Sequence, residues 1–356
     1  MHTQTREEKS RKPKRPSPRP SRTTGEAGDK KAVKRPTRPS SYRPRTTAAS
    51  TEPVDRLAQV FTPSLLPRVY SFWFQHVEKD ENFTLPTQET FQRWFSRDPE
   101  FDLGCINEFE SILEAIRKEG KNATADRIIE LANPRSALDW LSLVILLDQI
   151  PRNCYRDAKS AVVFKFFDTR ARRVTFQAFN AGVLSSPEIR YRMALRFWFY
   201  LPLMHSESLR MHAVAMRKYR EMESELLQLL EAGRRRPEGG APVAAEEVDD
   251  EELEPKQLEN EGEAGNEEEE EEEVEDEVQD DFNDKLLERK EFEYAWMLGK
   301  NPEAVKALCA LLVKTEGEHR EIIARFGRYP HRNQALQRTT KPEEEKFLAE
   351  NQSFGG

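Results

Sequence analysis

The sequence predicts an all-α protein, arranged as a tetratricopeptide-like α-α superhelix or as an irregular helical array. Three observations support this prediction. Alternating runs of β-branched residues bounded by hairpin turns are almost absent, and glycine is scarce, at 15 of 356 residues. Apolar residues instead recur at helical spacing along most of the chain. Short loops between these helices suit a stack of helix pairs or an irregular bundle.

The helical spacing of apolar residues locates the individual helices. One clear example starts at Phe101 and ends at about Lys118, with apolar residues three or four positions apart on one face. A short C-terminal helix follows Thr340, a suitable N-cap, and carries Pro342 and several glutamates in its first turn. The other helices are expected over Leu65–Phe74, Gln88–Phe95, 135–149, 159–181, 187–201, 206–232, 283–298 and 302–326.

Two strongly charged segments flank or interrupt the predicted helical domain, which comprises residues 51–233 and 283–356. The basic arm, residues 1–50, has fifteen Lys or Arg against four Asp or Glu, a net charge of +11. The acidic insert, residues 234–282, includes seven consecutive glutamates, Glu267 to Glu273. Neither segment has the apolar content to offset the chain entropy lost on folding, so both are predicted to be disordered.

The charged segments also suggest partners. The stretch KSRKPKRPSPRP, which starts at Lys9, resembles a nuclear-import or nucleic-acid-contacting arm, and a solubilising tail is the alternative. The acidic insert suits a basic protein partner such as a histone tail, or it is only a solvated insertion.

Several features bear on the compartment. Frequent prolines in the arm disfavour the amphipathic helix of a mitochondrial presequence. The apolar runs are too short to cross a bilayer, so no membrane contact is expected. The odd number of cysteines, without metal-binding spacing, is typical of a reducing compartment. The sequence therefore predicts a cytoplasmic or nuclear protein.

The first of three polar clusters is DQIPRN (148–153), which follows an apolar helix over 135–149. Apolar residues on nearly every side predict that this helix is buried. Pro151 is expected to end it, which places Asp148 in the last turn, where the helix dipole opposes its charge. A buried acid needs a cation nearby, such as Arg152 or an arginine from the C-terminal loop.

The second cluster is YLPLMHSE (200–207). Pro202 is expected to break or kink the preceding aromatic helix. Ser206 is expected to cap the next helix, with Glu207 as an acid in its first turn. Capping does not account for His205.

The third cluster is RFGRYPHRN (325–333), behind a helix whose apolar stripe includes His319. Gly327 suits a left-handed residue at the helix end, and Pro330 keeps the chain from resuming the helix. Arg325 and Arg328 suit the negative end of that helix. This explanation does not extend to the remaining residues His331, Arg332 and Asn333.

These motifs, in this order, resemble the family called domain of unknown function 924. The resemblance rests on LLDQIPRN (146–153), FYLPLMHSE (199–207), RFGRYPHRN (325–333), FWF (72–74), DPEFD (98–102) and the ending KFLAENQSF. It covers about 65–233 and 283–356, and it implies an all-helical, tetratricopeptide-like fold. No biochemical activity is established for the family, so the resemblance implies no reaction. The basic arm and the acidic insert depart from the compact family pattern.

Three functions remain open from the sequence. The first is a helical scaffold or interaction protein, whose polar clusters tie helix ends together. The second is a pocket for an anionic or phosphorylated small ligand, because guanidinium groups bind carboxylate and phosphate bidentately. The third is a metal-assisted hydrolase that uses the histidines and acids. The candidate ligand-binding residues are Asp148, Gln149, Arg152, Asn153, His205, Glu207, His319, Arg325, Arg328, His331, Arg332 and Asn333.

Overall fold

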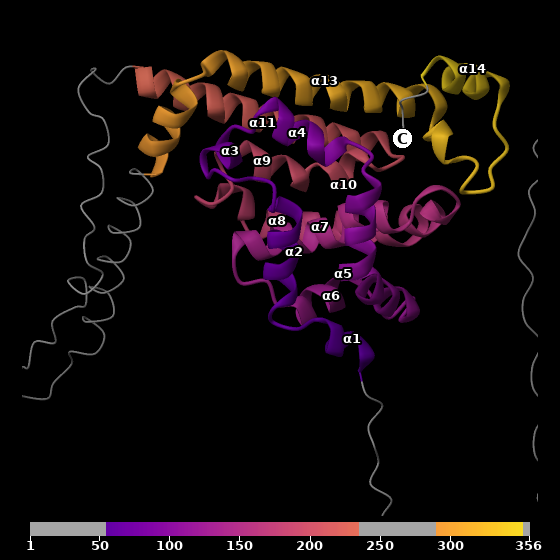
Figure 1. Cartoon of the computed structure of the whole chain (residues 1–356). Helices are drawn as coiled ribbons and strands as arrows, with labels where there is room; N and C mark the ends of the chain where they lie inside the picture. Colours follow the sequence, from indigo (N-terminus) through magenta and orange to yellow (C-terminus); the bar gives the residue numbers. More distant parts are fainter. Residues whose placement is uncertain (1–54, 235–289, 352–356) are drawn as a thin grey trace, which may run out of the picture. The chain divides into compact units, whose positions relative to one another are not determined.

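Helix α7 (Ala137–Cys154) lies at the centre of the fold, with α2 (Leu65–Phe74), α5 (Pro99–Lys118) and α8 (Asp168–Asn180) packed against it (Figure 1). Every residue of α7 from Leu141 to Pro151 is buried, as expected for a helix that is apolar on nearly every side. The computed structural model describes residues 55–234 and 290–351. The basic arm and most of the acidic insert lie outside the described residues.

The remaining elements are helices of different lengths. The long helices α11 (Leu209–Arg234) and α13 (Pro302–Phe326) pack side by side, and residues 290–299 are also helical (Figure 1). The shorter ones are α1 (Arg56–Val60), α3 (Glu81–Thr84), α4 (Gln88–Phe95), α6 (Ala125–Ala132), η1 (Asp157–Ser160), η2 (Val163–Phe167), η3 (Val183–Ser185), α9 (Met193–Arg196), η4 (Phe197–Phe199), α10 (Leu201–Met204), η6 (Pro330–Arg332) and α14 (Pro342–Glu350).

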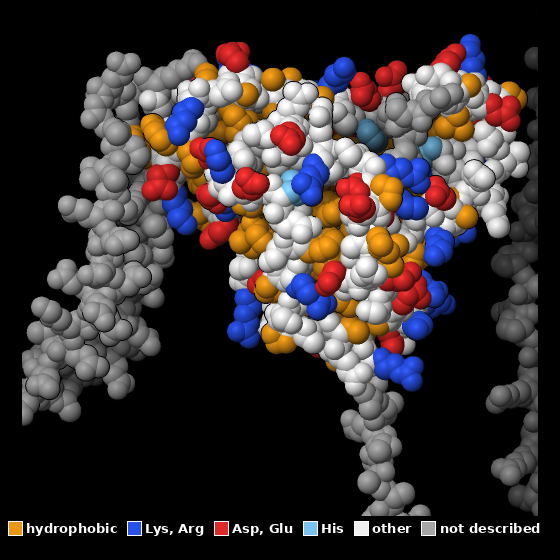
Figure 2. All heavy atoms as spheres, in the orientation of Figure 1, with side chains coloured by type: hydrophobic (Ala, Val, Ile, Leu, Met, Phe, Trp, Pro, Cys, Tyr) orange, Lys and Arg blue, Asp and Glu red, His pale blue; other side chains and the backbone are white. Residues whose placement is uncertain are grey.

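The prediction of an all-α protein is confirmed, because the described residues contain helices and no strand. Whether the helices form a tetratricopeptide-like superhelix stays a prediction. Within the described ranges, each helix is too short or too polar to span a bilayer. Charged side chains of both signs are interspersed on one face, with apolar side chains exposed between them (Figure 2).

The expectation that Pro151 ends its helix is wrong. Helix α7 continues through Pro151 to Cys154 and ends with a bond from the Tyr155 N–H to the Pro151 carbonyl. Pro151 itself is buried in the helix, and the Nδ2 of Asn153 donates to the carbonyl of Gln149 at 3.1 Å. Asp148 therefore lies more than a turn before the helix end, and Arg152 lies one turn after it on the same face.

The helix predicted over 187–201 is instead broken into the short pieces α9, η4 and α10. The predicted cap at Ser206 is also wrong, because α11 begins at Leu209 and the first backbone bonds run to the Ser208 carbonyl. Glu207 is thus not a first-turn acid. Its carboxylate accepts from the backbone N–H of Tyr329 and from the guanidinium of Arg338, which anchors the C-terminal loop.

The C-terminal loop begins as the sequence predicts. Gly327 ends α13 with φ 70°, a left-handed conformation that glycine adopts without steric cost. Pro330 starts the short helix η6, and Pro342 is the first residue of α14. Thr340 is not the N-cap of α14, which is Lys341. The buried carboxylate of Glu344 instead accepts from the Lys341 N–H at 2.8 Å.

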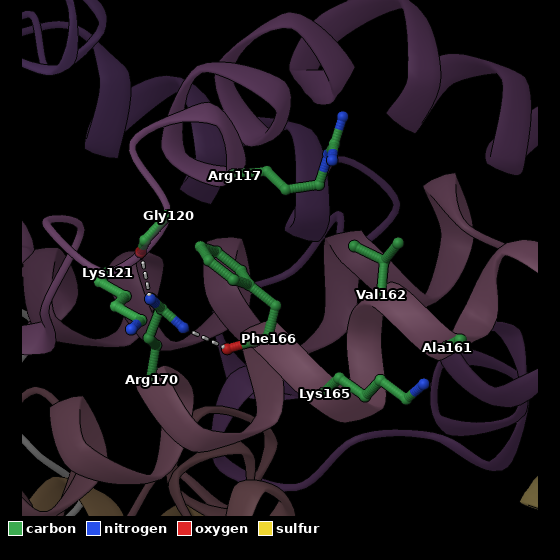
Figure 3. Close-up of a pocket in the computed structure, with 8 residues that line it drawn as sticks. All are labelled: Arg117, Gly120, Lys121, Ala161, Val162, Lys165, Phe166 and Arg170. Atoms are coloured by element: carbon green, nitrogen blue, oxygen red, sulfur yellow. Dashed lines mark hydrogen bonds between the residues drawn. The ribbon is translucent and has the colours of Figure 1, made fainter. Parts of the chain in front are cut away.

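Arg170 of α8 holds the loop between α5 and α6 by hydrogen bonds (Figure 3). Its guanidinium donates to the carbonyls of Gly120, Ala123 and Phe166 at 2.6 to 2.8 Å. The same group lies 3.5 Å from the centroid of the Phe166 ring. One side chain therefore fixes the loop between α5 and α6 against α8.

Replacing Arg170 tests this connection. In Arg170→Met, carbonyls of the loop lose their donor, and we expect the free energy of unfolding to fall by about 1–3 kcal/mol. Urea denaturation followed by circular dichroism measures it. Arg173→Met is the control on the same helix. The Arg173 side chain is 68% exposed, and its ion pair with Asp126 is long, at 4.0 Å. Equal effects of the two substitutions would contradict the connection.

Candidate functional site

A cavity of about 1150 Å³ opens between α4, α7, the η4–α10 segment, α13 and the C-terminal loop. We call it the inter-helix cavity. Its polar lining includes Gln149, Arg152 and Asn153 from α7, together with His205. His319 from α13 and the pair His331 and Arg332 complete this lining. The three polar clusters of the sequence thus meet at one place.

Asp148 lies behind the cavity wall, with no exposed surface, and organises three of these side chains. Its Oδ1 accepts from Nδ1 of His205 and from the Arg152 guanidinium, both at 3.0 Å, and its Oδ2 accepts from Gln149 at 2.6 Å. Burial acts to raise the pKa of Asp148, but the charges and hydrogen bonds of His205 and Arg152 outweigh it and lower the pKa to about 2. Asp148 is therefore ionised at neutral pH.

Asp168, at the start of α8, joins the first cluster to the third. Its Oδ1 accepts from Arg152 at 2.7 Å, and its Oδ2 accepts from Arg332 at 3.3 Å. Both oxygens of this buried carboxylate are thus engaged by arginines from separate elements. We call the connected set Asp148, Arg152, Asp168 and Arg332 the Arg–Asp chain.

Arg332 is only 5% exposed, yet much of its hydrogen-bonding capacity is unused. Its guanidinium lies 4.4 Å from the ring centroid of Phe164 and 4.6 Å from that of Tyr329. Within the described part of the chain, its Nε has no hydrogen-bond partner, and the same holds for Nε of Arg152. Unpaired buried guanidinium donors are costly unless a ligand or water accepts from them.

Two histidines of the cavity, His319 and His331, are neutral at neutral pH. Burial is the main cause that lowers the pKa of His319 to about 4 and of His331 to about 3, and the charge of Arg332 adds to it in both. Burial also lowers the pKa of His205, reinforced by Arg152 and opposed by Asp148. The Nδ1–H groups of His205 and His319 are committed to Asp148 and to the Thr315 carbonyl. The arginines thus create a positive potential at the imidazoles.

The remaining predicted site residues lie away from the cavity lining and have structural partners. Arg328 and Asn333 both donate to the buried carboxylate of Glu344, at 2.7 to 3.0 Å. Glu207 holds the loop as described above. Arg325 is exposed, with its guanidinium 4.7 Å from the Phe326 ring centroid. These four residues secure the C-terminal loop or face solvent.

Asp168 was absent from the sequence prediction, although it is the link between the two arginines. It follows the π-helical turn η2, and Phe164 of that turn contacts Arg332 and lines the cavity. π-helical turns are often found at functional sites. The available sequence signal is the acid that ends the aromatic run VVFKFFD (162–168).

Other groups in the described residues offer less chemistry. No set of three His, Cys, Asp or Glu side chains there has the arrangement of a metal site. Burial raises the pKa of Cys154 and Cys309 to about 12, so their thiols are poor nucleophiles. A second cavity of about 470 Å³ is lined by Lys121, Lys165 and Arg170 (Figure 3). The guanidinium of Arg170 already donates hydrogen bonds to backbone carbonyls.

The fold and site define an all-helical protein whose polar clusters converge on one cavity. The chain belongs to the DUF924 family, bacterial proteins of unknown function, whose family model matches residues 69–352. A solved structure of a protein of unknown function from Agrobacterium tumefaciens matches with a TM-score of 0.43 and 23% sequence identity, over 81% of this chain and 98% of that chain. Among curated proteins, none matches.

The Arg–Asp chain is expected to stabilise the folded state. In Asp148→Ala, Arg152, His205 and Gln149 lose a buried acceptor, so the free energy of unfolding is expected to fall by about 3–5 kcal/mol. Urea denaturation measures this change. Glu130→Ala is the control, since that carboxylate is 68% exposed and its pair with Arg127 contributes under about 1 kcal/mol. A loss below about 1 kcal/mol in Asp148→Ala would show that Asp148 is not part of a buried network.

The depressed pKa of His319 predicts a pH dependence. An unfolded histidine has a pKa of about 6.5, so between about pH 6.5 and about pH 4 the unfolded state binds more protons than the folded state. Stability therefore decreases as pH falls through this window, by about 3 kcal/mol from His319 at about pH 4. Denaturation at a series of pH values tests this, and His319→Gln should flatten the slope. An unchanged slope in His319→Gln would overturn the assignment.

Proposed function

We propose that the inter-helix cavity binds a small anionic molecule, with its anionic group between Arg152 and Arg332. The observation that carries the proposal is Arg332, which lines an open cavity although it is almost fully buried, and whose guanidinium donates to Asp168 from Nη1 at 3.3 Å. A guanidinium offers five donors in a planar fork that matches carboxylate and phosphate oxygens. Asp168 takes one hydrogen bond from each arginine, which leaves donors on both for a ligand.

The charged side chains that line the cavity favour an anion rather than a cation, because they comprise four arginines, Arg97, Arg152, Arg156 and Arg332, and one carboxylate, Asp157. Arg152 and Arg332 pair with Asp148 and Asp168, which lie behind the lining, and the neighbouring His319 and His331 are neutral at neutral pH. An anion bound beside them raises the pKa of each imidazole, because an opposite charge favours the protonated form.

A helical scaffold is the second candidate function. The ion pairs between Arg328 and Glu344 and between Arg338 and Glu207 favour it, because they tie the C-terminal loop to the body without lining the cavity. A scaffold does not require an open cavity beside Arg152 and Arg332, whereas an anion pocket accounts for that space.

Titration calorimetry with phosphate and with acetate, at constant ionic strength, tests the proposal. We expect saturable binding that weakens at least about tenfold in Arg332→Met, because a hydrogen bond to a charged group contributes about 1.5–3 kcal/mol. Arg332→Lys keeps the charge but not the fork, so it also weakens binding and remains informative if Arg332→Met fails to fold.

Arg325→Met is the matched control, since Arg325 is exposed and lies on the same segment outside the cavity. It should bind both anions as the unaltered chain does. No saturable binding of either anion, or full binding by Arg332→Lys, would contradict the anion pocket.

A further inference from the structure

One wall of the inter-helix cavity changes from apolar to polar along a single helix. Leu311, Thr315 and His319 of α13 all line the cavity. They are spaced four residues apart, so they lie on nearly the same face of the helix. The rise of a helix puts the first and last of them about 12 Å apart. The cavity therefore has an apolar end at Leu311 and a polar end at His319.

A second wall repeats this order. Phe197, Leu201 and His205 line the cavity from η4 through α10, again with a histidine eight residues after an apolar side chain. In Figure 1 the chain runs from α9 to α10 in the same sense as it runs along α13, and α10 packs against α13. The two histidines are also close enough for the charge of His205 to lower the pKa of His319. Both walls thus place their apolar residue at the same end.

The apolar end is a cluster of aromatic rings. The ring centroids of Phe91, Phe95 and Phe197 lie 5.0 to 6.1 Å from one another. Phe95 is 49% exposed and Leu311 is 46% exposed, and both line the cavity. They are two of the five large hydrophobic side chains that are exposed in the described residues. Exposed apolar surface beside a polar site is typical of a ligand-binding surface.

The size of the cavity exceeds what a single anionic group needs. A water molecule occupies about 30 Å³ in the liquid, and pockets of roughly 300–1,000 Å³ hold drug-sized ligands. The inter-helix cavity, at about 1150 Å³, has room for such a molecule. A phosphate bound alone at Arg332 would leave the aromatic end of the cavity filled with water.

We propose that the ligand is an amphipathic anion, with a phosphate or carboxylate head and an unbranched hydrocarbon tail. The head lies at Arg152 and Arg332, and the tail passes Thr315 to the rings of Phe95 and Phe197. The proposal rests on the anion pocket proposed above and adds the chemical class of the ligand. The head alone does not account for the aromatic end, whereas a tail covers its exposed apolar surface.

A series of monoalkyl phosphates tests this inference. The probes are ethyl, butyl, hexyl and octyl phosphate, each titrated calorimetrically below its micelle concentration into the full chain. Each buried methylene is expected to tighten binding about three- to fourfold, until the tail extends beyond Leu311.

Leu311→Ser shortens the apolar wall without touching the head site. The substitution should weaken the binding of octyl phosphate by at least about tenfold and leave the binding of ethyl phosphate unchanged, because only the longer tail reaches Leu311. Leu103→Ser is the matched control: this leucine of α5 is 56% exposed and does not line the cavity, so binding of both probes should be unaffected.

The outcomes separate the two proposals. Equal binding of ethyl and octyl phosphate overturns the amphipathic ligand and leaves the anion pocket standing. No binding of any member of the series overturns the anion pocket itself. A dimer in light scattering that becomes a monomer in Leu311→Ser means that a second copy of the chain covers the aromatic end, which also overturns the amphipathic ligand.

Discussion

The site depends on one carboxylate, that of Asp168, shared by two arginines. Arg152 comes from the central helix α7, and Arg332 comes from the C-terminal loop some 180 residues further along the sequence. A buried guanidinium without a counter-charge costs several kcal/mol, so neither arginine is stable at its position without a nearby acid. Asp168 therefore fixes where the C-terminal loop meets the helical body.

Three other carboxylates complete the arrangement: Asp148 and Glu344 are buried, and Glu207 is half-buried. Asp148 orients Arg152 and His205 from behind the cavity. The Glu344 carboxylate accepts hydrogen bonds from Arg328, from Asn333 and from the backbone N–H of Lys341 at the start of α14. Glu207 holds the backbone of Tyr329 from the other side. Asp148 and Glu207 each engage a donor from an element distant in sequence, and Glu344 engages donors of the C-terminal loop. Asp148 and Asp168 position the two guanidinium groups. The same contacts that stabilise the fold thus leave the cavity with anion-binding capacity.

Much of the fold could be predicted from the sequence, because local patterns determine most of these helices. The bounds Leu65–Phe74, Gln88–Phe95 and 302–326 agree with the structure, and the burial of Asp148 and its pairing with Arg152 follow from the apolar helix around it. The continuation of α7 through Pro151 was not predictable, since the tertiary packing of this buried helix overcomes the local preference of proline.

The site was only partly predictable, for a physical reason. Local patterns show that His205, Arg332 and Asp148 are unusual, but which acid each arginine meets is decided by tertiary packing. Asp168 and the rings of Phe91 and Phe95 belong to segments whose residues are individually ordinary. The short pieces α9, η4 and α10 also depend on tertiary contacts, because their sequence reads as one continuous aromatic helix.

The most direct test observes the two guanidinium groups themselves. In ¹⁵N NMR spectra of the full chain, the Nε–H resonances of Arg152 and Arg332 are assigned by substitution and followed during titration with octyl phosphate. We expect both resonances to shift together and to saturate with the binding isotherm, while the resonance of the exposed Arg325 does not change. Saturable binding of octyl phosphate without any shift at Arg152 and Arg332 would contradict this expectation.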